Sequence, residues 1–130
     1  MISSMRLDGT TACMHLPGAA DTAAFVTYLK EVLCPTLRPR DIVVMDNLAV
    51  HKSPEVQRLV GSVGAEVRFL PAYSPDLNPI EKMWSKIKSL LRSAEARSPE
   101  QLDAAISVAF SKVTAKDAMG WFASCGYSII

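Results

Sequence analysis

The sequence predicts an α/β fold in one domain, and three observations support this. Residues 41–47 hold an apolar, β-branched run of four bounded by polar residues, which is typical of a buried strand. A helical segment and a second apolar strand follow it closely, in the order of a compact α/β unit. The 130 residues are 49% hydrophobic, which is enough for one domain with its own core.

The N-terminal segments predict a hairpin and a helix. Residues 1–16 contain two short strand-like stretches separated by Asp8-Gly9, a pair that favours a hairpin turn. Residues 21–37 carry apolar side chains at helical spacing, and Pro35 ends or bends this helix near its last turn. We expect this helix to cover the sheet, and the strand over 41–47 to be covered on both faces.

A capping residue followed by proline marks the start of three later helices, because proline suits the first helical position. These pairs are Ser53-Pro54, Asn78-Pro79 and Ser98-Pro99. The predicted elements are a helix over 53–63, a strand over 66–70, and helices over 79–94, 99–113 and 114–122. The apolar tail, 123–130, is expected to pack back or to pair with another segment.

Composition narrows the function classes only slightly. The net charge of +1 does not indicate a globally basic protein, so nucleic-acid binding has to be judged from local patches. The three cysteines have no metal-ligand spacing and are typical of reduced, mostly buried residues in a cytosolic protein. No secretory signal and no membrane-spanning stretch is visible, so we expect a cytoplasmic location.

Asp46 is the first candidate for chemistry. It stands at the C-terminal end of the predicted strand, at the sheet edge where open α/β folds place their ligands. A structural alternative is an Asp-Asn turn, since Asp46 and Asn47 can both bond locally to the backbone.

Glu81 is the second candidate, and 34 residues lie between it and Asp46. It is the third residue after Asn78, so a capping box at the start of a helix would explain it structurally. That explanation does not account for the rigid entry, where Ser74-Pro75 and Asn78-Pro79 bracket Asp76. Such stiffness suits the exact placement of a carboxylate. Two hard oxygen ligands without a Cys or His cluster favour Mg²⁺ or Mn²⁺ over zinc.

Basic residues occur close to both acids. His51 and Lys52 follow the Asp46 strand, and four cations lie on the helix that Glu81 opens: Lys82, Lys86, Lys88 and Arg92. This helix is the most basic segment and a candidate track for DNA phosphates. The alternatives are an ordinary solvated helix face and a solvated loop histidine.

Asp46-Asn47, His51 and the run from Phe69 to Trp84 resemble the catalytic domain of Tc/mariner-type transposases, particularly their bacterial insertion-sequence relatives. The resemblance covers nearly the whole chain, and its most specific part is Ser-Pro-Asp-Leu-Asn-Pro-Ile-Glu, ending at Glu81. It implies a ribonuclease H-like fold and a DDE endonuclease in which three acids hold two divalent metal ions. Asp46 matches the second acid and Glu81 the third, and His51 and Lys52 become candidate DNA contacts.

The family's first catalytic Asp has no counterpart here, because Asp8 matches a hairpin turn and Asp21 a helix cap. The resemblance therefore implies the C-terminal part of a transposase, truncated at its N-terminus and lacking the first central strand. For the sheet we expect one of three outcomes: direct pairing of residues 1–7 with the Asp46 strand, an exposed edge that aggregates, or a partner chain in the gap.

Two functions follow from the resemblance. The first is DNA transposition, as part of a metal-dependent transposase that is inactive as this isolated chain. The second is a non-catalytic DNA-binding or dimerisation module that inhibits an intact transposase. The implied partners are transposon-end and target DNA, together with a second copy or an upstream-encoded transposase half. The implied location is the nucleoid.

Overall fold

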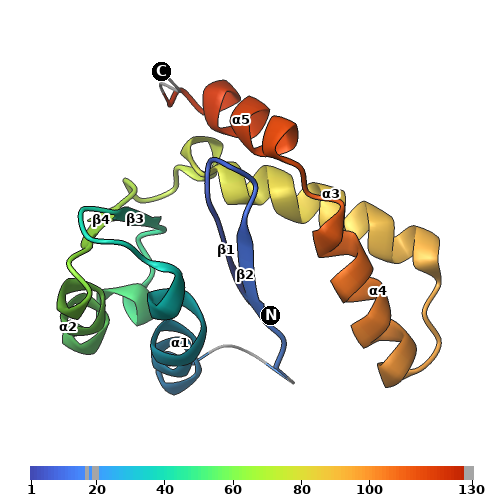
Figure 1. The fold of residues 1–130 in the computed structure, drawn as a ribbon, viewed down its shortest axis with the longest axis horizontal. Helices are drawn as coiled ribbons and strands as arrows, with labels where there is room; N and C mark the ends of the chain where they lie inside the picture. Colours follow the sequence, from blue (N-terminus) through green and yellow to red (C-terminus); the bar gives the residue numbers. More distant parts are fainter. Residues whose placement is uncertain (17, 19–20, 128–130) are drawn as a thin grey trace. The chain divides into compact units, whose positions relative to one another are not determined.

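The computed structural model describes residues 1–16, 18 and 21–127 (Figure 1). The chain divides into two compact units, where the sequence predicts one domain. The first unit comprises Met1–Ser4 with Ala12–Pro75, and the second comprises Met5–Thr11 with Asp76–Ile130. Each unit has its own hydrophobic cluster.

Two parallel strands form the centre of the first unit. β3 (Ile42–Met45) pairs with β4 (Glu66–Phe69), in a register that sets Ile42 opposite Glu66 and Met45 opposite Phe69. The ladder extends at both ends, because Glu66 N donates to Asp41 O at 2.9 Å and Leu70 N donates to Met45 O at 2.8 Å. The connection between the strands is helix α2 (Pro54–Ser62), which begins at the predicted Ser53 cap.

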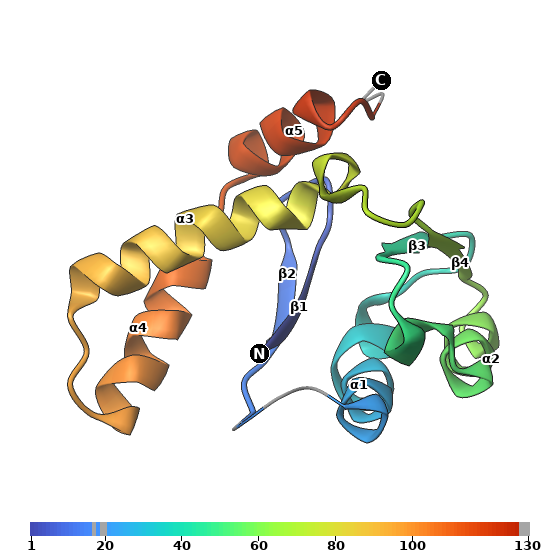
Figure 2. The same cartoon turned by 180° about the vertical axis from the view of Figure 1, so that it is seen from behind.

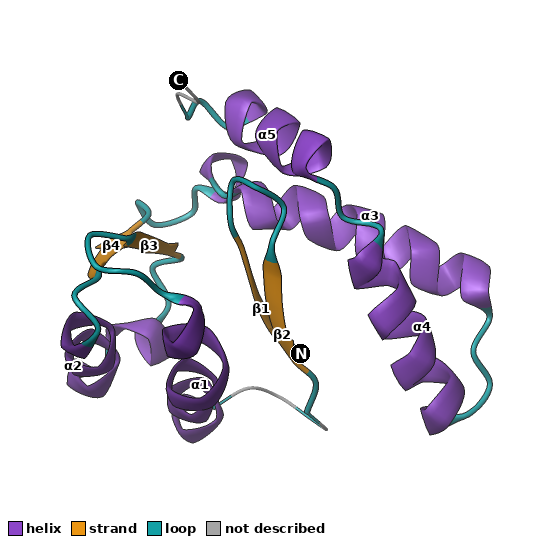
Figure 3. Cartoon of the chain, in the orientation of Figure 1, coloured by secondary structure: helices purple, strands orange, loops and turns teal. Residues whose placement is uncertain are grey.

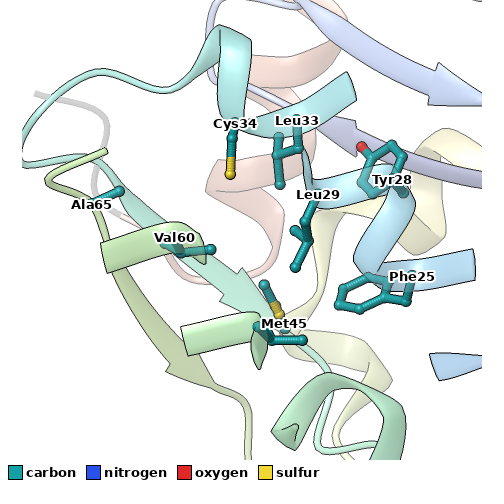
Figure 4. Close-up of a cluster of buried hydrophobic side chains, with 9 residues drawn as sticks. Phe25, Tyr28, Leu29, Leu33, Cys34, Met45, Val60 and Ala65 are labelled. Atoms are coloured by element: carbon teal, nitrogen blue, oxygen red, sulfur yellow. The ribbon is translucent and has the colours of Figure 1, made fainter. Parts of the chain in front are cut away.

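The core of the first unit lies between one face of this strand pair and its helices. α1 (Thr22–Tyr28) continues into a π-helical segment, Leu29–Leu33, and a 3₁₀ turn, Cys34–Thr36. Both α1 and α2 lie on the same side of the strand pair, as the view from behind also shows (Figure 2). Buried side chains from α1 and the two turns that follow it, from α2, from β3 and from the residue before β4 form this cluster (Figure 4): Phe25, Tyr28, Leu29, Leu33, Cys34, Met45, Val56, Val60 and Ala65.

Tyr28 links α1 to the N-terminal hairpin. Its hydroxyl donates to Ala12 O at 2.7 Å, and burial raises the pKa of Tyr28 to about 12. The bond satisfies a polar group that would otherwise be costly to bury. The helix therefore contributes Phe25 and Tyr28 to the core of the first unit, and the Tyr28 hydroxyl finds a backbone partner.

The expectation that β3 is covered on both faces is wrong. Ile42 is 58% exposed and Val44 is 41% exposed, whereas Val43 and Met45 pack on the core. The parallel register sets these two exposed residues beside Glu66 and Arg68, which form an ion pair of 2.9 Å. One face of the strand pair is thus apolar and the other mixed, which the short apolar run of β3 could not reveal.

In the described part of the chain, the N-terminal hairpin forms a second, two-stranded sheet. β1 (Ile2–Met5) and β2 (Thr11–Met14) are joined by a turn in which Arg6 N donates to Thr10 O at 2.8 Å. Gly9 has φ +90°, and a Cβ there would come within 2.8 Å of Ala115 N, so glycine is required. Among the described residues the two sheets stay separate, so the direct pairing expected between residues 1–7 and the Asp46 strand is not found.

Three helices belong to the second unit and are drawn in purple in Figure 3. α3 (Pro79–Ala94) packs against both α4 (Pro99–Ser111) and α5 (Ala115–Ser124). The centre of this cluster is fully apolar and consists of Met83, Ile87, Ala109 and Val113. Residues 128–130 of the predicted tail lie outside the described residues, but Tyr127 packs its ring edge-on against Phe122 with centroids 5.6 Å apart.

The cysteines and the hydropathy of the helices were both considered in the sequence, and the structure describes each of them. Cys34 and Cys125 are buried, Cys13 is partly buried, and all three are free thiols. None of the helices in the described part of the chain is long and apolar enough to cross a membrane.

Lys86 connects α3 to α5. Its Nζ forms an ion pair with Asp117 and also donates to Lys112 O at 2.7 Å. Asp117 in turn accepts from Thr114 N, while Thr114 Oγ1 accepts from Asp117 N, which completes a capping box at the start of α5. The Lys86 ammonium holds the pKa of Asp117 below its ordinary value of 3.8.

Replacing Lys86 with Met is expected to lower the free energy of unfolding by about 1 to 2 kcal/mol near neutral pH. A depressed carboxyl pKa stabilises the fold above the ordinary value and loses that effect as pH falls through the lowered pKa. The difference between the wild type and K86M should therefore become smaller in acid, where the bond from Lys86 Nζ to Lys112 O still remains. Lys82→Met, an exposed position on the same helix, is the control and should change stability by less than about 0.5 kcal/mol in urea unfolding.

Candidate active-site acids and their surroundings

Asp46 directly follows the last residue of β3, at the carboxyl end of the parallel strand pair. Its side chain is partly buried, and the chain then enters a 3₁₀ turn, Ala49–Lys52. This is the strand end at which parallel sheets carry ligand-binding side chains. Asp46 thus occupies the position that the sequence predicts for it.

Asn47, the next residue, carries a polar atom without a hydrogen-bond partner. Its Oδ1 is buried, and no described residue donates to it. A buried acceptor left unpaired costs about 1 to 3 kcal/mol, so a donor or a cation at this point would be stabilising. In the sequence, Asn47 has a place in a turn and in the family resemblance, but no role as an acceptor in the site was predicted for it. The available signal was a second polar residue placed directly after an apolar strand.

His51 lies against the backbone of Asp46. Its Nδ1 is 3.0 Å from Asp46 O, and its ring is 4.5 Å from the ring of Phe25, centroid to centroid. The neighbouring Lys52 is exposed. The structure therefore places Asp46, Asn47 and His51 together at one strand end of the first unit.

Glu81 lies in the first turn of α3, and its structural explanation fails. Asn78 Oδ1 accepts from Ile80 N at 3.2 Å, but the reciprocal bond of a capping box is not formed. The Glu81 carboxylate is exposed and makes no hydrogen bond or ion pair with the described residues. Asp117 shows the contrast, because its carboxylate completes the capping box of α5. The predicted capping role of Glu81 is thus wrong, and the carboxylate is available for another role.

The turn before α3 is held from the C-terminal end of the chain. Pro75–Leu77 form a 3₁₀ turn, and Leu77 O accepts from the Tyr127 hydroxyl at 2.8 Å. This bond adds to the restriction that Pro75 and Pro79 impose on the backbone. The start of α3, and with it the backbone of Glu81, is therefore restricted by the two prolines and by the hydrogen bond from Tyr127.

The cations predicted to contact DNA fall into two groups. In the first group, Lys82, Lys88 and Arg92 are exposed. Lys88 and Arg92 lie on the same face of α3 as Glu81 and Ser85, because residues spaced by three or four positions share a helix face. Lys86 does not belong to this surface, because Asp117 and Lys112 O hold its ammonium group. Lys86 therefore has a structural role in the second unit, and its contact with DNA stays a prediction.

The donor set fits a hard divalent cation in kind but is incomplete in number. Asp46, Glu81 and Asn47 offer only oxygen, the atom that Mg²⁺ and Mn²⁺ prefer. In the described part of the chain, no three His, Cys, Asp or Glu residues gather closely enough to hold a metal ion. Asp46 belongs to the first unit and Glu81 to the second, so each is placed within its own unit.

Comparison with known proteins identifies the family. Residues 1–103 match the family described as DDE superfamily endonuclease, a range that includes both candidate acids. The chain belongs to this family. No curated protein and no solved structure matches the chain. Membership supports a transposase-like nuclease function with DNA as the substrate, and divalent metal ions are general in the family. The α/β architecture, with small sheets and α-helices, is compatible with such a domain.

Proposed function

We propose that this DDE endonuclease chain is part of a Tc/mariner-type transposase of a bacterial insertion sequence, with a ribonuclease H-like fold. It would cut the ends of the mobile element and transfer the strands to target DNA. The observation that carries the proposal is the exposed carboxylate of Glu81, which has no structural partner among the described residues. It ends the run most specific to that class of transposase.

Asp46 and Glu81 are the proposed ligands of Mg²⁺ or Mn²⁺. When bound, such ions activate an oxygen nucleophile and neutralise charge on the phosphate. The chain's own contribution is to fix the two carboxylates, one at a strand end and one at a helix start. Asn47 Oδ1 is a third oxygen, next to Asp46, and is suited to accept from a water molecule beside the ion.

Lys52, Lys82, Lys88 and Arg92 are the proposed phosphate contacts. All four side chains are exposed, and Lys88 and Arg92 share the face of α3 that begins with Glu81. Cations on this face would hold the DNA backbone along the helix that carries the acid. A DNA substrate would place the chain at the nucleoid of a bacterial cell.

The remaining acid of the site, which would correspond to the family's first catalytic Asp, is proposed to come from outside residues 1–130. The resemblance implies three acids, and the sequence matches only the second and the third of them, at Asp46 and Glu81. An upstream-encoded half or another copy of a transposase chain would bring it. A site that lacks one ligand misplaces the nucleophile, and an error of about 1 Å can cost roughly 100-fold in rate.

The isolated chain is therefore expected to show no strand transfer. The test incubates it with DNA carrying the genomic sequences that flank its coding region, in Mg²⁺ or Mn²⁺, and follows cleavage on a sequencing gel. Adding the product of the upstream coding sequence should restore cleavage. Cleavage by the isolated chain that disappears in Asp46→Ala would contradict the proposal of an external acid.

A non-catalytic module is the second candidate, favoured by the lack of a residue in the sequence that matches the family's first catalytic Asp. Such a module would bind DNA or dimerise and so inhibit an intact transposase. Co-expression distinguishes the two functions, because inhibition would persist in Asp46→Asn and Glu81→Gln variants. If the wild-type chain restores transposition and the Asp46→Asn and Glu81→Gln variants do not, the catalytic role is favoured.

A further inference from the structure

The contact between His51 and Asp46 fixes the hydrogen positions on the imidazole. A backbone carbonyl can only accept, so Nδ1 of His51 must carry the hydrogen across the 3.0 Å contact. In the neutral ring Nε2 is then the unprotonated nitrogen. The imidazolium form also has a hydrogen on Nδ1, so the bond persists in both charge states.

The orientation of the ring is fixed by the core. Phe25 is 93% buried in the first hydrophobic cluster, and its ring lies 4.5 Å from the His51 ring at an interplanar angle of 34°. Aromatic pairs at this separation favour a defined mutual geometry. The imidazole therefore has one face against a rigid residue of α1 and one nitrogen on the strand end.

The chain between the two residues is short. Asp46 ends the strand, and His51 belongs to the 3₁₀ turn Ala49–Lys52, whose backbone closes with His51 N donating to Leu48 O at 3.0 Å. The Nδ1 bond joins this turn back to Asp46 and closes a loop of six residues from 46 to 51. The backbone that carries the Asp46 carboxylate is thus held from the side of α1.

We infer that His51 is a positioning residue for Asp46, acting through the Nδ1–H bond to the Asp46 carbonyl with its ring held by Phe25. This differs from a contact between His51 and a DNA phosphate, which would require a hydrogen on Nε2 in the neutral ring. An effect of His51 on cleavage rests on the proposed function. The Nδ1–H tautomer of His51 follows from the contact with Asp46 O alone.

Asn and Gln substitutions separate these two roles. The amide nitrogen of Asn is one bond from Cγ, as Nδ1 is, whereas that of Gln is two bonds away, as Nε2 is. H51N should therefore retain the bond to Asp46 O, and H51Q should lose it. In the reconstituted cleavage reaction we expect H51N to stay within about threefold of the wild type. We expect H51Q to fall by up to roughly 100-fold, the cost of a displaced carboxylate.

The tautomer is measured without DNA, metal or activity. The chain has two histidines, so a ¹⁵N-labelled His15→Gln protein leaves only the His51 signals. We expect a protonated-type shift at Nδ1 and an unprotonated-type shift at Nε2 at alkaline pH. The amide signals of Asp46 and Asn47 should move in H51Q and remain near their wild-type positions in H51N.

Each other outcome overturns the inference. An Nε2–H tautomer would remove the bond, whatever the activities. Retained activity in H51Q with loss in H51N would indicate a contact through Nε2, and equal activity in both variants would show that the bond does not matter. If the wild type proves inactive under all conditions, the proposed function fails, while the tautomer and the amide shifts still decide whether His51 holds Asp46.

Discussion

Replacing Asp46 with Asn is expected to lower transposition in cells by at least about 100-fold, and replacing Glu81 with Gln should have a similar effect. Both changes keep the shape of the side chain and remove a negative oxygen that would bind a divalent cation. Loss of such a ligand affects both the affinity for the ion and the position of the reacting groups. The measurement is the transposition frequency of a marked element carrying the coding region with its flanking genomic DNA.

Two matched substitutions serve as controls for this experiment. Asp41→Asn alters the acid at the other end of β3, and Glu100→Gln alters an exposed acid in the first turn of α4. They reproduce the change in charge and the loss of a helix-dipole interaction without touching the proposed site. Equal transposition by these controls and by D46N or E81Q would contradict the assignment of the acids.

Neutralising Lys88 and Arg92 together is expected to weaken DNA binding and to reduce its dependence on salt. Each phosphate contact contributes about 0.9 to the slope of log K against log salt concentration, so two lost contacts should reduce the slope by about 2. Both side chains are exposed on the face of α3 that starts with Glu81. The measurement is fluorescence anisotropy of labelled duplex DNA with the Lys88→Gln/Arg92→Gln variant at several salt concentrations.

The control for this charge change is the Lys30→Gln/Lys116→Gln variant, which removes two exposed cations from other helical segments. It alters the net charge equally and should leave the slope within experimental error of the wild type. A similar decrease in both double variants would show that DNA responds to total charge. That result would remove α3 as the DNA track.

Local signals in the sequence predicted the helix starts well. Ser53-Pro54, Asn78-Pro79 and Ser98-Pro99 each provide a capping residue and a proline at the first helical position, as the structure has them. Such starts depend on a few neighbouring residues, so they can be recognised without the fold. The position of Asp46 at the end of a strand was predictable for the same reason.

Contacts between distant residues were not predictable in this way. Lys86 looks like its exposed neighbours in the sequence, but it pairs with Asp117, 31 residues later. The apolar run of β3 gives no sign that Ile42 and Val44 are exposed, because run length does not distinguish one covered face from two. The His51–Phe25 ring contact also requires the packed core of the first unit.

The choice between cap and catalyst for Glu81 illustrates the limit of motif reasoning. Asn78 and Glu81 have the spacing of a capping box, but Asn78 bonds Ile80 N and the Glu81 carboxylate is not used. Thr114 and Asp117 have the same spacing, and both bonds form. Equal spacing thus leads to different hydrogen bonding, and only the structure separates the two sites.

Paramagnetic broadening by Mn²⁺ tests most directly whether Asp46 and Glu81 bind one ion. In ¹⁵N-labelled protein, low Mn²⁺ should broaden the amide signals of residues 45–47 and 80–82 together, while those beside Asp41 and Glu100 stay sharp. Asp46→Asn should then abolish the broadening near Glu81, and Glu81→Gln should abolish it near Asp46. Broadening near Glu81 that survives unchanged in Asp46→Asn would show that the two acids do not share an ion.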